Sequence, residues 1–91
     1  MPERFTVTVT IKNRLGLHAR PAMTFVDLAG TFKAEITVKR GDQEVDGKSI
    51  MHMMMLAATK GTALEVIAVG ADAQAACEAL KKLVDSGFDE D

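Results

Sequence analysis

The sequence predicts an α+β fold: a two-layer, open-faced β-sandwich in which a four-stranded antiparallel sheet carries three helices on one face. Segments with alternating apolar and polar residues are typical of strands that bury one face. Segments with apolar residues three or four positions apart are typical of helices with one apolar stripe. The two kinds follow one another in the order βαββαβα, which favours packing in two layers. A length of 91 residues suits a single domain over 1–91.

The first part of the chain supplies two strands with a helix between them. Residues 5–11 alternate apolar side chains with threonines, which predicts the first strand. A helical spacing of apolar residues runs from about Ala19 to Gly30. Pro21 suits the first turn of this helix, because no N–H donor is needed there. Alternation returns over residues 33–39 and predicts the second strand.

A hairpin, a short helix and a fourth strand follow. Residues 40–42 read R-G-D, a turn signal, so residues 43–46 should pair back as a short third strand. A helix is expected from about residue 50 to residue 57, and Ser49 is placed to act as its N-cap. Residues 63–69 are rich in apolar and β-branched side chains and predict the fourth strand.

The last element should be a helix with Asp72 as its N-cap and Gly87 as its stop. Its apolar stripe is formed by Ala76, Cys77, Leu80, Leu83 and Val84. Residues 88–91 close the chain with three acidic side chains, and we expect them to form a flexible, solvated tail.

The composition excludes several classes of protein. A net charge of −2 gives no positive field for nucleic acid, and four Phe without Trp or Tyr offer little surface for stacking bases. No apolar run approaches the ~20 residues that span a bilayer, and the first residues lack a signal-peptide pattern. The single cysteine, Cys77, fits a core position in a reducing compartment. We therefore expect a cytoplasmic protein without nucleic-acid binding or membrane insertion.

The stretch L-G-L-H-A-R-P-A, residues 15–22, places His18 just before the helix that Pro21 opens. The first N–H groups of a helix lack intrahelical partners and carry partial positive charge, so they attract an anion. Arg20 adds a permanent charge whose planar fork matches phosphate oxygens. Gly16 permits a tight backbone path that exposes the imidazole. His18 is therefore a candidate phosphoryl acceptor beside an anion site.

Two other interpretations of His18 stay open on the residues alone. A lone histidine in a loop is commonly no more than an exposed side chain. A hydrolase would need a base that activates water, and no Asp or Glu lies within residues 13–26. The local residues therefore suit storing a phosphoryl group better than hydrolysing it.

Four of the six methionines crowd into residues 51–55. At helical spacing, Met53 and Leu56 should face the sheet. The other apolar side chains of this short helix fall on a different face, and seven residues cannot bury every side chain. We expect an exposed apolar patch at Ile50, Met51 and Met54. Flexible methionines suit a surface that binds several partners in turn.

The motif at residues 15–22 resembles the active-site motif of the HPr family, the histidine phosphocarriers of the bacterial phosphotransferase system, with its nitrogen-branch relatives called NPr. The segment G-K-S-I-M at 47–51 resembles the family's regulatory serine segment, and K-G-T at 60–62 falls in register. The ending at 86–91 is similar to NPr proteins, whereas D-G-K-S-I-M is similar to HPr. The resemblance covers nearly the whole chain and implies the same fold.

The resemblance implies a phosphocarrier with a covalent phosphohistidine intermediate, not a turnover enzyme. His18 would accept a phosphoryl group on Nδ1 from enzyme I, which takes it from phosphoenolpyruvate, and would pass it to an enzyme IIA. The Arg20 side chain and the backbone N–H groups of Ala19 and Arg20 would hold the phosphoryl oxygens. Neither a metal nor an organic cofactor is implied, and we expect a monomer.

The resemblance also implies a regulatory position and a docking surface. Ser49 matches the residue that the ATP-dependent HPr kinase/phosphorylase modifies in many relatives, although capping alone also explains a serine there. The family's docking surface for enzyme I and enzyme IIA corresponds to Leu17, Ala19, Ile50, Met51 and Met54. His52 is interpreted as a surface histidine, because neither a helix N-terminus nor an arginine adjoins it.

The expected docking face is less basic than is usual in the family. Asp27 and Gly30 stand near positions that often carry lysine, although Lys48 remains. A second class of function therefore stays open: a nitrogen-branch regulatory module whose phosphorylation state is read by kinases, transporters or transcription regulators. The residues leave the branch undecided between sugar uptake and nitrogen and potassium regulation.

Overall fold

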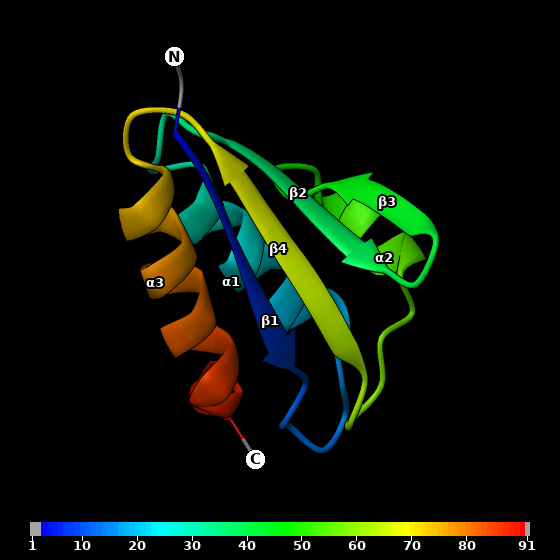
Figure 1. Ribbon diagram of the computed structural model, residues 1–91. Coiled ribbons are helices and arrows are strands. Elements are labelled where there is room, and N and C mark those ends of the chain that lie inside the picture. Colours follow the sequence, from blue (N-terminus) through cyan, green and yellow to red (C-terminus); the bar gives the residue numbers. More distant parts are fainter. Residues whose placement is uncertain (1–2, 91) are drawn as a thin grey trace.

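A computed structural model describes residues 3–90 and shows four strands and three helices (Figure 1). The strands are β1 Arg4–Thr10, β2 Glu35–Arg40, β3 Gln43–Asp46 and β4 Ala63–Val69. The helices are α1 Ala19–Ala29, α2 Ile50–Met55 and α3 Ala73–Asp85, with a short 3-10 turn, η1, at Gly87–Asp89. The predicted fold class is confirmed: the helices lie together behind one face of an open sheet (Figure 1).

The sheet has the strand order β1-β4-β2-β3, and all neighbouring strands run antiparallel. One row of valines crosses the four strands side by side: Val7, Val66, Val38 and Val45. A slip of one residue in any pair would move that strand's valine to the solvent side, so burial of this row specifies the register.

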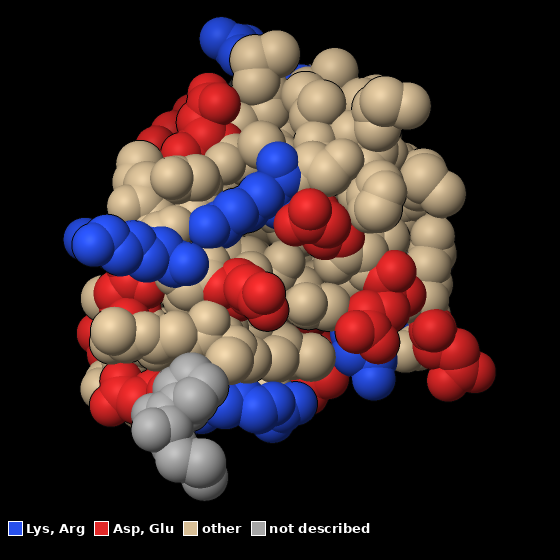
Figure 2. Space-filling view, turned by 90° about the horizontal axis from the view of Figure 1, so that it is seen from above, with Lys and Arg blue, Asp and Glu red and all other residues tan. Residues whose placement is uncertain are grey.

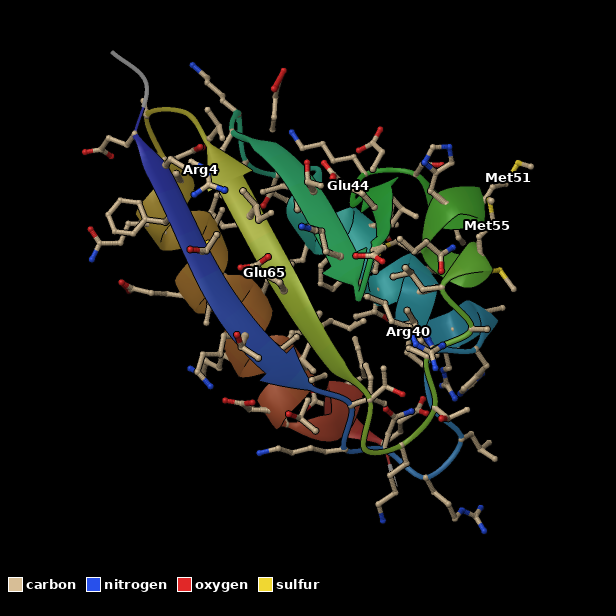
Figure 3. All side chains as sticks on the ribbon, turned by 45° about the vertical axis from the view of Figure 1, so that its right-hand side comes forward. Arg4, Arg40, Glu44, Met51, Met55 and Glu65 are labelled. Carbon is tan, nitrogen blue, oxygen red and sulfur yellow. The ribbon has the colours of Figure 1, made fainter. Side chains whose placement is uncertain are left out.

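The core lies between the sheet and the helices. Phe25 of α1, Met53 of α2 and Leu80 of α3 are each at most 1% exposed. The opposite face of the sheet is polar, and Figure 3 shows Arg4 and Glu65 on the side of the sheet away from the helices. None of the helices among the residues that the structure describes is long and apolar enough to cross a membrane.

The surface carries no single-sign field on the face seen in Figure 2. Lysine and arginine side chains alternate there with aspartate and glutamate. This mixture agrees with the small net charge of −2.

Helix α2 is shorter than the sequence predicts, and an arginine from the sheet lies at its end. The expected helix reaches residue 57, but Ala57 adopts a φ of 49°. A residue in this left-handed conformation ends a helix. The Arg40 guanidinium donates from Nη1 to the carbonyl oxygens of Leu56 at 2.7 Å and of Ala57 at 3.1 Å. These bonds satisfy carbonyl groups that the helix leaves free.

Asp72 does not cap α3 through its side chain, contrary to the prediction. Its carboxylate accepts hydrogen bonds from the backbone N–H groups of Lys33 and Ala34, both at 2.8 Å. The Lys33 bond is the main cause that lowers the pKa of Asp72 below its usual value. Asp72 therefore joins the start of β2 to the start of α3, a contact between segments far apart in the chain.

The predicted solvated tail over residues 88–91 is wrong for Phe88, which is buried, and for Glu90, which is half-buried, whereas Asp89 is exposed. Phe88 is only 7% exposed and follows Gly87, whose φ of 67° turns the chain back onto the core. Burying a phenylalanine side chain stabilises the folded protein by about 1.5–3 kcal/mol. The acidic residues beside Phe88 do not cancel this gain as long as their carboxylates stay solvated. The burial of Phe88 carries Glu90 to the end of the molecule where β1 leads into α1 (Figure 1). Asp91 lies outside the described residues.

We predict opposite outcomes for two methionines of α2. Met53 is fully buried, whereas Met51 is 75% exposed and points away from the fold in Figure 3. Met53→Ala should lower the free energy of unfolding by about 2–5 kcal/mol, because it leaves a cavity. Met51→Ala should change it by about 0.5 kcal/mol or less. Urea denaturation measures both, and equal losses would contradict this division of the helix.

Candidate functional site

The loop between β1 and α1 is fixed against the segment after α2. The Leu17 N–H donates to the Ala58 carbonyl oxygen at 2.8 Å. Gly16 has a φ of 72°, and a Cβ placed there would come within 2.6 Å of the Ala58 oxygen and 2.9 Å of the Thr59 Cα. Only glycine fits this close approach of two backbones. The contact therefore fixes the position of His18 at the start of α1.

His18 is the N-cap of α1, with extended backbone angles and no side-chain cap on the helix. Its side chain is 39% exposed. The N–H groups of Ala19 and Arg20, in the first turn, have no acceptor within the helix. Arg20 is exposed, and Pro21 is buried. The structure thus presents the histidine, two free N–H groups and a guanidinium at one helix end, an arrangement that suits a phosphoryl group.

Two residues that the sequence reasoning missed complete this end of the molecule. Glu90 Oε1 lies 2.9 Å from His18 Nε2. The buried Asn13 donates from Nδ2 to Glu90 Oε1 at 3.0 Å and to the Gly16 carbonyl oxygen at 2.7 Å. The hydrogen bond with His18 is the main cause that lowers the pKa of Glu90 below its usual value. No local pattern could have indicated Glu90, because it lies 72 residues from His18.

Ser49 lies at the start of α2 as its N-cap. Its Oγ accepts a hydrogen bond from the His52 N–H at 3.3 Å. The neighbouring Lys48 donates from Nζ to the Phe32 carbonyl oxygen at 2.7 Å. His52 is itself engaged at the end of β3, where its Nδ1 accepts from the Asp46 N–H at 3.2 Å. Ser49 is half-buried and its hydroxyl oxygen lies at a helix start, where added negative charge is favourable.

An exposed apolar patch lies along α2 and the neighbouring α1, which pack against each other. Met51 is 75% and Met54 46% exposed, whereas Ile50 is half-buried against the core. Leu17 is only 5% exposed, so it belongs to the core and offers almost no area to a partner, unlike its predicted docking role. Other large exposed apolar side chains, which the sequence reasoning did not select, are Leu15, Met23 and Met55.

The position of Met23 in the sequence could have identified it as part of the exposed apolar patch. It lies four residues after Ala19, on the same helix face as the residue next to His18. We define the methionine patch as Met23, Met51, Met54 and Met55.

The described residues contain no group of three or more His, Cys, Asp or Glu side chains placed to hold a metal ion. Cys77 is buried, and burial raises the pKa of its thiol above the usual value. Its Sγ donates to the Phe5 carbonyl oxygen at 3.5 Å, so it occupies a core position between α3 and the edge of the sheet.

The fold and the site together define a class: small α+β proteins that present one histidine at the N-terminus of a helix. The family model described as "PTS HPr component phosphorylation site" matches residues 5–86 of the chain. The phosphocarrier protein HPr of Pseudomonas putida is 48% identical over 91 residues, covering 99% of this chain and 98% of that protein. The phosphocarrier protein NPr of Proteus mirabilis is 43% identical over 84 residues, covering 91% and 93%.

A solved structure agrees with these sequence relatives. The HPr-C-His structure from Thermoanaerobacter tengcongensis superposes with a TM-score of 0.92 at 41% identity, covering 96% of this chain and 98% of that one. The chain therefore belongs to the HPr family, the phosphocarrier components of the phosphotransferase system. This confirms the family inferred from the motif at residues 15–22.

We predict that Gly16→Ala disrupts this site while Gly41→Ala does not. Both glycines have a positive φ, 72° and 58°, but a Cβ at Gly41 would meet nothing within 4 Å. Gly41→Ala should cost only the left-handed strain of about 1–2 kcal/mol. Gly16→Ala should cost about 1–3 kcal/mol more, because it pushes against the backbone of Ala58 and Thr59. Thermal unfolding measures the stabilities, and an equal cost at both glycines would show that the close approach is not required.

Proposed function

We propose that His18 is the phosphoryl acceptor and donor of this carrier. It receives the group on Nδ1 from the phosphorylated histidine of enzyme I and passes it to a histidine of an enzyme IIA. The observation that carries the proposal is the position of His18 at the N-terminus of α1, with Arg20 in the first turn, in a chain of the HPr family.

The transfer needs positioning more than activation. The lone pair of Nδ1 forms a bond to phosphorus while the bond from phosphorus to the donor nitrogen breaks, and that electron pair stays on the donor. Because the bond formed and the bond broken are alike, the step runs in both directions, and orientation supplies most of the acceleration. The N–H groups of Ala19 and Arg20 and the guanidinium of Arg20 balance the charge of the phosphoryl oxygens.

The methionine patch is the proposed docking surface for enzyme I and enzyme IIA, together with Ala19. Met51 and Met54 expose 75% and 46% of their surface next to the helix that carries His18. Flexible thioether side chains adapt to partners of different shape. Leu17 is left out of this surface because it is buried. We further infer that the carrier works as a monomer in the cytoplasm and needs no cofactor of its own.

We predict that phosphoenolpyruvate and a cognate enzyme I place an acid-labile phosphoryl group on the wild-type protein. His18→Ala should abolish the label, because it removes the nucleophilic nitrogen. His52→Ala is the matched control and should keep full labelling, since His52 lies within α2 and its ring accepts a hydrogen bond from the Asp46 N–H of β3. Absence of label on the wild type, or persistence of label in His18→Ala, would reject the carrier mechanism at His18.

Ser49 is the proposed site of regulatory phosphorylation by an ATP-dependent HPr kinase/phosphorylase. A phosphate on its Oγ would sit at the first turn of α2 and be favoured by the helix N–H groups. The added charge would also lie beside Met51 and Met54 and hinder docking of an acidic partner surface. The capping bond to His52 alone also accounts for a serine at this position.

We predict that ATP and an HPr kinase give an acid-stable label on Ser49. Ser49→Ala should remove it, whereas Ser86→Ala should retain it, because Ser86 is the chain's other serine and its hydroxyl donates to Leu83 at the end of α3. If the wild type takes no label, Ser49 is a cap and not a regulatory site. If Ser49→Ala keeps the label, the kinase acts elsewhere.

A second candidate is the nitrogen-branch regulatory module. The placement of Asp27 on α1 and of Gly30 at its end favours it. Similarity to relatives does not separate the two candidates, because NPr of Proteus mirabilis is 43% identical and HPr of Pseudomonas putida 48%. In that case His18 would still be phosphorylated, but kinases, transporters or transcription regulators would read its state. Pull-down with the unphosphorylated and phosphorylated protein distinguishes the two, because a pure carrier binds only enzyme I and enzyme IIA.

A further inference from the structure

We propose that Glu90 is a positioning residue for His18: its carboxylate holds the Nε2–H of the imidazole, so that Nδ1 presents its lone pair to the phosphoryl group. Asn13 holds Glu90 in turn. This inference rests on the function proposed above and adds to it a residue from the opposite end of the chain.

The hydrogen bonds of Asn13 define the direction of the network. The two neighbours of its amide nitrogen are the Gly16 carbonyl oxygen at 2.7 Å and Glu90 Oε1 at 3.0 Å. A carbonyl oxygen only accepts, and so does an ionised carboxylate, so the amide nitrogen must lie on this side and uses both of its hydrogens. Asn13 is 1% exposed, and so its orientation is set by the surrounding core.

The same oxygen of Glu90 determines the tautomer of His18. Oε1 lies 2.9 Å from Nε2, and an ionised carboxylate can only accept there. Nε2 must therefore carry the hydrogen. A neutral imidazole has a single N–H, which leaves the lone pair on Nδ1. The lowered pKa of Glu90, caused mainly by the bond with His18, agrees with an ionised carboxylate in this contact.

The segment that carries the Glu90 carboxylate is anchored to the fold. Phe88, two residues before it, is buried at 7% exposure, and the Glu90 N–H donates to the Gly87 carbonyl oxygen at 3.0 Å. The Glu90 side chain is 21% exposed, while the His18 side chain remains 39% exposed. The imidazole is therefore held by the carboxylate and still accessible.

The contact also matches the charge that develops during transfer. When Nδ1 bonds to phosphorus and the donor's phosphorus–nitrogen bond breaks, Nε2 keeps its proton. The ring therefore gains positive charge, and the Glu90 carboxylate at 2.9 Å stabilises it. In the proposed carrier function, Arg20 and the helix N–H groups balance the charge of the phosphoryl oxygens. The positive ring is thus met by Glu90 and the negative phosphoryl oxygens by the first turn of α1.

Two variants of Glu90 and one matched control test this role. Glu90→Gln keeps a carbonyl oxygen that can accept from Nε2–H but removes the charge, and Glu90→Ala removes both. Asp89→Asn removes the same charge one residue earlier, where the side chain is exposed. Nitrogen-15 NMR of the unphosphorylated protein reports the Nε2–H signal of His18, and labelling with phosphoenolpyruvate and enzyme I reports the transfer rate.

We predict a slowly exchanging Nε2–H signal in the wild type and in Asp89→Asn. The signal should persist in Glu90→Gln at a shifted frequency and be lost in Glu90→Ala. The rate of phosphorylation should fall on the order of 10-fold in Glu90→Ala, with a smaller loss in Glu90→Gln. This is the lower end of the loss seen when a metal-binding histidine loses the partner of its other ring nitrogen. Thermal unfolding of each variant separates this effect from a loss of fold.

Two outcomes would overturn the role of Glu90, and they are distinguishable. If the wild type is labelled on His18 but both Glu90 variants keep its Nε2–H signal and its rate, the positioning role fails and the carrier function stands. If the wild type takes no label, the carrier function fails, and the role of Glu90 in transfer fails with it.

Discussion

The close approach of Gly16 to the backbone of Ala58 and Thr59 is the constraint on which the site depends. A Cβ at Gly16 would meet two backbone atoms under 3 Å away, so only glycine lets the β1–α1 loop lie against the segment after α2. From that contact follow the Leu17–Ala58 hydrogen bond, the burial of Leu17 and the position of His18 at the start of α1. The Gly16 carbonyl oxygen also receives the Asn13 amide, so the same residue supports both the histidine and its carboxylate partner.

Helix α2 shows how one short element can serve the core and a surface. Six residues make fewer than two turns, so the helix has one buried side, occupied by Met53, and its remaining methionines lie outside. Because α2 packs on α1, the exposed methionines lie next to the helix that carries His18. A partner bound at the methionine patch would therefore lie next to the helix end at which His18 is exposed, which supports the docking role proposed for the patch.

The end of the chain reaches the site at residues 13–18 for a hydrophobic reason. Phe88 buries its ring, and the residues after it must then follow the surface toward the β1–α1 loop. An acidic ending by composition suggests a solvated tail, but composition does not reveal that one aromatic residue within it has a place in the core. The hydrogen bonds of Asp72 were likewise not visible in the sequence, because its partners Lys33 and Ala34 lie 39 and 38 residues away.

The sequence by itself determined the strands, the helices and the fold class, because the spacing of apolar residues, every second residue or every 3.6 residues, can be seen within a short segment. It also determined that His18, Ala19 and Arg20 share one helix end, since they are consecutive and the helix start needs no distant residue. Tertiary structure alone decided that Leu17 is buried, that Arg40 closes α2, that Glu90 contacts the imidazole and that Asn13 donates to Glu90. These are contacts between distant segments, and they exist only after the apolar faces have packed and brought those segments together.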